Sequence, residues 1–249
     1  MRKPLMAGNW KMYKTPAETK AFFEKLLPLV ASASHCDAAI CPPFVCLETA
    51  IAATAGSNIG IGAQNLYWAK EGAFTGEISG PMIKAIGATY VIVGHSERRQ
   101  YFGETDETVL KRTVASIDAG LTPIVCVGEL LAERESDSTA AVLGKQFRDG
   151  IAGLTDEQFS KIIIAYEPVW AIGTGKTATP EMAADAHRML RSEISAKFGA
   201  SAAQSTRILY GGSVKPDNIK GLMAQPDIDG GLVGGASLDA ASFASLVNF

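Results

Sequence analysis

The chain has 249 residues, of which 47% are hydrophobic and 20% charged, and its formal net charge is −3 at pH 7. This composition is that of an ordinary globular protein, long enough to bury a large core. The charge balance excludes the broad basic surface that binds nucleic acid, so an anionic ligand would need positive potential that is built locally. No stretch reads as a membrane span and the amino terminus has no apolar signal core, so a cytoplasmic protein is expected.

Eight short apolar runs alternate with longer helical patterns along the chain. The runs are rich in Ile and Val and apolar on both faces, as strands of a parallel sheet are when both sides are covered. They cover residues 5–10, 38–41, 59–63, 90–93, 122–127, 162–165, 207–210 and 228–233. Each strand-and-helix unit averages about thirty residues, the size of one βα repeat.

Helix-start signals stand between several of these runs. Thr15 is followed by a proline and by Glu18, which gives an N-cap, a proline in the first turn and a capping-box carboxylate. Thr179 precedes another proline in the same way, and Asp239 is expected to open the last helix.

Eight consecutive units without a linker predict an α/β fold, a single-domain (β/α)8 barrel of eight parallel strands over residues 1–249. The alternative is an open, doubly wound sheet, which needs a glycine-rich turn after its first strand. The first strand here ends Gly8-Asn9-Trp10-Lys11, which is no such turn. In a barrel the chemistry lies at the carboxyl ends of the strands, which narrows the search to a few polar positions.

Two glycine loops follow the seventh and eighth predicted strands. They read Tyr210-Gly211-Gly212-Ser213-Val214 and Val233-Gly234-Gly235-Ala236-Ser237. Glycine lets successive N–H groups point at one spot, and a helix amino terminus adds partial positive charge. One such loop could be no more than a tight turn, but two after strands seven and eight favour a phosphate site.

Glu167 stands at the tip of the sixth predicted strand, directly before Pro168. Residues 168–178 have an apolar middle between this proline and two glycines, so they can move as a lid or else pack permanently over the rim. The Gly175-Lys176-Thr177 segment resembles the end of a P-loop, but Trp170 stands where that motif requires glycine. The P-loop interpretation of this segment is therefore rejected.

Asn9, Lys11 and His95 are further polar residues at the predicted rim. A helix that begins at Ser96 or Glu97 would disfavour the imidazolium of His95 and keep its ring neutral. A neutral imidazole can donate a proton to a carbonyl oxygen and take it back. Lys11 is the cation expected near the reacting oxygens, and Glu97 is a candidate to pair with it. A structural histidine and a surface lysine are the simpler alternatives.

No metal or cofactor is expected. Cys36, Cys41 and Cys46 lie five residues apart beside His35, but this spacing fits no common zinc pattern, so buried reduced thiols are predicted there and at Cys126. No nicotinamide or flavin fingerprint appears. A base, a neutral acid and a cation can move a proton next to a carbonyl unaided, so the residues predict cofactor-free proton transfer on a small sugar phosphate.

At these residues the chain closely resembles the triosephosphate isomerase family, from Asn9 to the last helix. The resemblance rests on residues 94–99, which read GHSERR, on residues 165–176, which read AYEPVWAIGTGK, and on the two glycine loops. One departure is Leu130, where the family often has a small hydroxyl residue, and it leaves open only how the fifth helix begins.

The resemblance implies a TIM barrel that interconverts D-glyceraldehyde 3-phosphate and dihydroxyacetone phosphate through an enediolate, in glycolysis and gluconeogenesis. Glu167 would carry the proton between the two carbons, and His95 would shuttle protons at the oxygens. Lys11 and Asn9 would stabilise the charge that develops. The phosphate would be held by the backbone N–H groups of Gly173, Ser213, Gly234 and Gly235. A closed lid would exclude water and keep the enediolate from expelling phosphate.

The resemblance also implies a homodimer in which the third βα loop inserts into the partner. Here this loop runs from Gln64 to Glu77 and carries Tyr67, Trp68 and Phe74, which would be an exposed apolar patch on a monomer. The family pattern places Thr75 near the neighbouring active site.

Two other classes of function fit a barrel with a phosphate site: another phosphate-binding enzyme, such as an epimerase or an aldolase, and a non-catalytic sensor. A metal-dependent epimerase would need histidine and aspartate ligands that the sequence lacks, and a Schiff-base aldolase would need a lysine deep on the sixth strand. A non-catalytic sugar-phosphate sensor would be expected to lose Glu167 or His95, and both are present.

Overall fold

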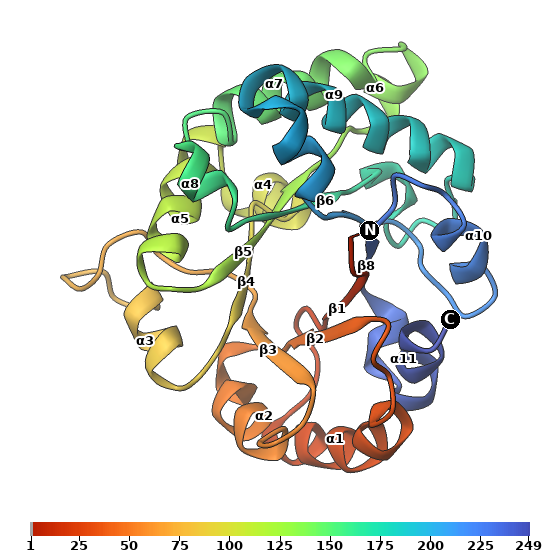
Figure 1. The fold of residues 1–249 in the computed structure, drawn as a ribbon. Coiled ribbons are helices and arrows are strands. Elements are labelled where there is room, and N and C mark those ends of the chain that lie inside the picture. Colours follow the sequence, from red (N-terminus) through yellow and green to blue (C-terminus); the bar gives the residue numbers. More distant parts are fainter. Residues whose placement is uncertain (1) are drawn as a thin grey trace.

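The computed structural model describes residues 2–249 and shows a closed ring of eight parallel strands in chain order (Figure 1). The strands are β1 Leu5–Asn9, β2 Asp37–Cys41, β3 Ile59–Ala63, β4 Tyr90–Val93, β5 Thr122–Val127, β6 Ile163–Tyr166, β7 Ile208–Tyr210 and β8 Gly230–Val233. Because β1 pairs with both β2 and β8, the ring has no free edge. The predicted barrel is confirmed, and the alternative of an open, doubly wound sheet is wrong.

The eighth strand begins later than its apolar run. Residues 228–229 belong to the run, but regular pairing starts at Gly230, where φ is 131°. A Cβ at this position would lie 1.9 Å from the carbonyl oxygen of Leu5, so only glycine can bring the backbone so close to β1. The sixth strand ends one residue later than its predicted run, at Tyr166. Glu167 therefore lies directly at its tip.

Helices surround the ring (Figure 1). They are α1 Pro16–Val30, η1 Phe44–Cys46, α2 Leu47–Ala53, α3 Gly80–Ala85, α4 Ser96–Phe102, α5 Asp106–Asp118, α6 Leu131–Glu135, α7 Thr139–Gly150, α8 Asp156–Phe159, η2 Val169–Ala171, α9 Pro180–Ser205, α10 Ile219–Met223, η3 Gly235–Leu238 and α11 Ala240–Val247. The predicted start signals are confirmed. The side chains of Thr15, Thr179 and Asp239 each accept a backbone N–H from the first turn of α1, α9 and α11.

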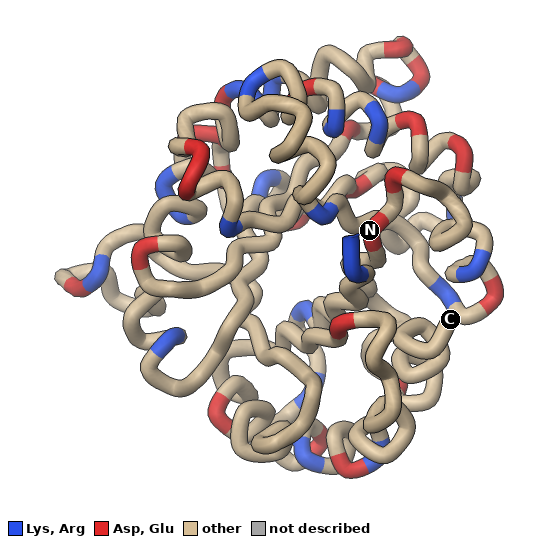
Figure 2. The backbone as a smooth tube through the Cα atoms, viewed as in Figure 1, with Lys and Arg blue, Asp and Glu red and all other residues tan. Residues whose placement is uncertain are grey.

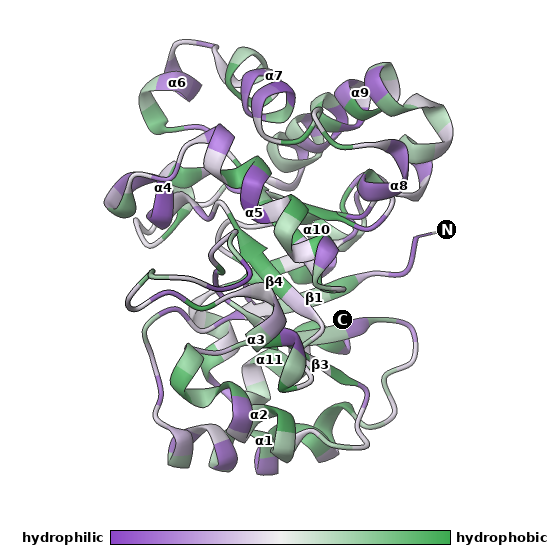
Figure 3. Ribbon diagram, turned by 90° about the vertical axis from the view of Figure 1, so that its left-hand side faces the viewer, coloured by the Kyte–Doolittle hydropathy of each residue, from purple (hydrophilic) through white to green (hydrophobic). Residues whose placement is uncertain are grey.

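Two apolar layers hold the barrel together. Alternate strand residues point inward and fill the ring, among them Leu5, Ile92, Ile124 and Leu209. The other strand residues face the helices in a larger cluster, and Figure 3 shows the strands as hydrophobic and the outer helix faces as mixed or hydrophilic. Because side chains fill the ring, a ligand can be held only where the strands end.

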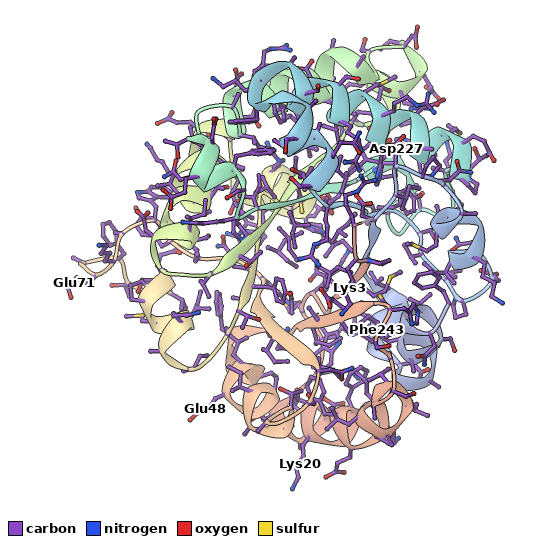
Figure 4. All side chains as sticks on the ribbon, in the orientation of Figure 1. Lys3, Lys20, Glu48, Glu71, Asp227 and Phe243 are labelled. Atoms are coloured by element: carbon purple, nitrogen blue, oxygen red, sulfur yellow. The ribbon has the colours of Figure 1, made fainter. Side chains whose placement is uncertain are left out.

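Charged residues lie around the outside with both signs interspersed (Figure 2). Lys20 of α1 and Glu48 of α2 extend outward, whereas Phe243 of α11 is buried (Figure 4). Among residues 2–249 no helix combines the length and the apolarity that crossing a bilayer requires. All four cysteines are buried and unpaired, as the spacing predicted.

Candidate active site

A cavity of ≈ 310 Å³ lies at the carboxyl ends of the strands. It brings together residues from both predicted ends of the site: Asn9, Lys11, His95, Glu167, Gly173, Ser213, Gly234 and Gly235. These residues follow five different strands, so the closed ring is what makes them neighbours. Glu97 is the one predicted site residue that does not line the cavity, and it acts through contacts with two residues that do.

Glu167 is buried at the tip of β6, with 2% of its surface exposed. Its Oε2 accepts the backbone N–H of Ser96 at 2.8 Å. Its Oε1 lies 2.9 Å from His95 Nε2 but outside the direction of a hydrogen bond, and no other group within residues 2–249 bonds to it. Burial alone would raise the pKa of Glu167, but His95, the Ser96 N–H and Lys11 outweigh it and hold this pKa below its usual value. The carboxylate is therefore ionised and has one unbonded oxygen.

His95 is the N-cap of α4, whose start at Ser96 confirms the predicted helix. Its Nδ1 accepts the N–H of Glu97 at 3.2 Å, which assigns the ring proton to Nε2 in the neutral form. Burial lowers the pKa of His95, but the Glu167 carboxylate in contact with the ring more than offsets this and raises it.

Lys11 lies two residues beyond the end of β1 in a strained backbone conformation, with φ 53°. Its N–H donates to Asn9 Oδ1 at 3.0 Å, and its carbonyl accepts from Gln64 Nε2 at 2.9 Å. Its ammonium lies 2.5 Å from Glu97 Oε1, so the pairing proposed from the sequence is present. Asn9 and Gln64 hold the backbone, and Glu97 fixes the direction of the charge.

The two glycine loops also line the cavity. The Gly211 N–H donates to the Tyr166 carbonyl at 2.6 Å, which ties the first loop to β6. The second loop leads into η3, where Ser237 donates to the carbonyl of Gly234. Within residues 2–249 no hydrogen bond uses the backbone N–H groups of the four predicted phosphate-binding residues, Gly173, Ser213, Gly234 and Gly235. These donors are free to bind an anion.

The lid predicted over residues 168–178 begins with η2 and reaches the cavity through residues 171–173. Its glycines, Gly173 and Gly175, have φ values of 69° and 80°, a backbone conformation that favours glycine. Trp170 Nε1 donates to Glu129 Oε1 at 3.0 Å, and the Tyr166 hydroxyl donates to the same oxygen at 3.0 Å. The sequence reasoning missed Glu129 as the anchor of the lid, because the contact spans 41 residues.

Other cavity residues were also missed as site residues: Tyr13, Ile172, Val214, Lys215 and Leu232. Tyr13 and Lys215 stand a few residues beyond a strand end, so a search restricted to the strand tips passes over them. Leu232 points inward near the end of β8 and has no polar group to mark it. Within residues 2–249 no group of three or more His, Cys, Asp or Glu side chains is placed to hold a metal ion.

Comparison with known proteins gives one consistent result. The family model described as triosephosphate isomerase matches residues 4–249. Curated proteins named triosephosphate isomerase match the chain along its whole length. That of Solibacter usitatus (strain Ellin6076) is 70% identical over 249 residues, all of both chains. Those of Citrifermentans bemidjiense and Moorella thermoacetica are each 55% identical over 100% of this chain and 99% of theirs.

Proposed function

The chain belongs to the triosephosphate isomerase family, and on this premise we propose that it interconverts D-glyceraldehyde 3-phosphate and dihydroxyacetone phosphate. It is an aldose–ketose isomerase, and the reaction is a step of glycolysis and also serves gluconeogenesis. The observation that carries this function is one cavity that brings together two unlike sets of groups. One set is a buried carboxylate, an imidazole and a lysine, and the other is free backbone N–H groups.

Glu167 is the base in this proposal. Its lowered pKa keeps it ionised near neutral pH, so it can take a proton from the carbon next to the carbonyl and return it to the neighbouring carbon. Its Oε2 first leaves the Ser96 N–H. The negative charge then develops on oxygens that face Lys11, Asn9 and the Nε2–H of His95, and these groups stabilise the enediolate. Glu97 orients Lys11 and His95 rather than touching the substrate.

The phosphate lies at the other end, on the N–H groups of Gly173, Ser213, Gly234 and Gly235. Because Gly173 belongs to the lid, phosphate binding favours closure, which removes water from the enediolate. The family is itself a standard example of pKa tuning and lid closure. The proposal requires no cofactor and no metal, because each proton is moved by a side chain of this chain.

A homodimer is part of the proposal, with residues 64–77 inserted into the partner and Thr75 near its active site. The loop tip at Glu71 extends away from the barrel (Figure 4). Tyr67 stacks on Trp68 at 4.2 Å and contacts Phe74 at 4.6 Å, so the aromatic residues form one patch. Further large apolar side chains are exposed, as a partner surface would explain: Met12 after β1, Phe44 and Val45 in η1, Met82 in α3, and Tyr101 and Phe102 in α4. We also propose a single domain over residues 1–249 and a cytoplasmic location.

The test of the activity is an isomerase assay with glyceraldehyde 3-phosphate in buffer that contains a chelator and no added cofactor. Turnover to dihydroxyacetone phosphate is expected. Binding of the substrate without turnover would favour the non-catalytic sensor, and activity that returns only with added metal would favour an epimerase-type barrel.

The test of the dimer is deletion of the loop tip between Tyr67 and Thr75, followed by sedimentation. Monomers are expected, because the aromatic patch is lost. The matched control replaces Lys70 and Glu71 with alanine, which leaves the aromatic side chains in place and should leave the dimer intact. A dimer that persists after the deletion would refute this interface.

A further inference from the structure

The two lysines that line the cavity differ in whether a carboxylate balances their charge. The Lys11 ammonium lies 2.5 Å from a Glu97 oxygen, so much of its charge is balanced before a ligand arrives. The Glu167 carboxylate adds a negative charge to the same space. Lys215 also lines the cavity, and it forms no salt bridge within residues 2–249. It is therefore the lining cation whose charge is not balanced by a carboxylate.

The backbone of Lys215 is fixed to the loop after β7. Its N–H donates to Asn218 Oδ1 at 2.9 Å, and the side-chain amide of Asn218 donates to the carbonyl of Ser213 at 2.8 Å. Its carbonyl accepts the N–H groups of Asn218 and Ile219, each at 3.1 Å. The Lys215 side chain itself is exposed. The exposed ammonium thus extends from a backbone that is fixed two residues beyond Ser213.

A phosphate monoester carries up to about two negative charges near neutral pH. The free N–H groups at the phosphate end supply hydrogen bonds and partial charges, but no full charge. The chain as a whole has a net charge of −3, so its overall field opposes an approaching anion. A cleft focuses the field of an unbalanced charge at its mouth, and this raises the association rate of an oppositely charged ligand.

We propose that Lys215 is a substrate-binding residue at the mouth of the cavity, which attracts the phosphate group to the loop after β7 and increases the preference for phosphorylated over neutral trioses. This role rests on the proposed isomerase function. It differs from that of Lys11, whose ammonium is paired with Glu97.

The experiment compares Lys215→Gln with Lys220→Gln in the full-length enzyme. Lys220 is exposed, lies at the start of α10 and does not line the cavity, so its substitution makes the same change in net charge nearby. For Lys215→Gln, kcat/KM for glyceraldehyde 3-phosphate should fall about threefold to tenfold at low ionic strength, and kcat should change less than twofold. The deficit should shrink above about 0.1 M salt, where the screening length is about 10 Å.

Two further measurements separate a charge effect from a structural one. Lys215→Arg should restore kcat/KM, and Lys215→Gln should leave kcat/KM for unphosphorylated glyceraldehyde unchanged. Equal salt dependence in Lys215→Gln and Lys220→Gln would overturn the proposal, as would an equal loss with glyceraldehyde. Failure of the isomerase function itself would look different, because the unsubstituted enzyme would then not turn over the triose phosphate.

Discussion

The two ends of the catalytic cavity are built in different ways. The reacting end consists of side chains, and each of its charges has a partner: Glu167 contacts His95, and Lys11 contacts Glu97. The phosphate end consists of glycine backbone with unused N–H groups. The first end depends on which side chains are present, and the second depends on the path of the backbone. Substitutions at the two ends should therefore fail in different ways.

The largest effect is expected from Glu167→Gln at the reacting end. Glutamine keeps the size of the side chain but cannot accept the proton, so kcat should fall by at least about 10²-fold, the low end for a general base. The affinity for inorganic phosphate, measured by calorimetry, should change less than twofold, because the phosphate-binding groups lie at the other end of the cavity. A parallel loss of phosphate affinity would show that the two ends are not separable in this way.

A smaller effect is expected from alanine in the glycine loops. A Cβ at Gly212 would lie 2.2 Å from the Tyr210 hydroxyl and 3.0 Å from Pro168 Cγ, so Gly212→Ala should lower the free energy of unfolding by about 1–3 kcal/mol. A Cβ at Gly235 meets nothing within 4 Å, so Gly235→Ala should keep its stability and only weaken phosphate binding. Urea unfolding and phosphate titration of both variants test this contrast. Equal destabilisation would contradict it.

The smallest effect concerns the pKa of Glu167, which lies below its usual value of 4.5. Since the folded-state pKa is lowered, the contacts of the carboxylate stabilise the fold above that usual value, and the stabilisation is lost as the pH falls through the folded-state pKa. His95→Gln removes a cause of the shift while burial persists, so the pKa of Glu167 should rise. Infrared spectra, with Glu167→Gln as the reference, report the carboxylate directly, and an unchanged titration in His95→Gln would refute this cause.

The sequence predicted the fold closely because barrel strands are apolar on both faces. It failed at the start of β8, because the predicted run includes residues 228–229 but the strand begins at Gly230, where only glycine fits against Leu5. That constraint comes from a strand more than two hundred residues away in the chain. Local patterns do not contain it.

The site residues that stand at strand ends were predicted from the sequence. Those that only the three-dimensional fold brings to the cavity were missed. Asn9, Lys11, His95 and Glu167 stand at or next to strand ends, and all line the cavity. The contact of His95 with Glu167, which raises the pKa of the imidazole, is encoded by no spacing in the sequence. Lys215 was missed because an exposed loop lysine has no local feature that distinguishes it.

The pairing of β8 with β1 also determines at what stage of synthesis the complete active site can form. The indole N–H of Trp10 donates to the Ser237 carbonyl, and Arg2 pairs with Asp229, both across 227 positions of the chain. A nascent chain on the ribosome thus holds Lys11 and Glu167 long before Gly234 and Gly235 are made. Until the last strand is released and joins the first, the sheet has two open edges, and such edges invite aggregation. Chains truncated before residue 230 should accordingly lack activity and depend on chaperones.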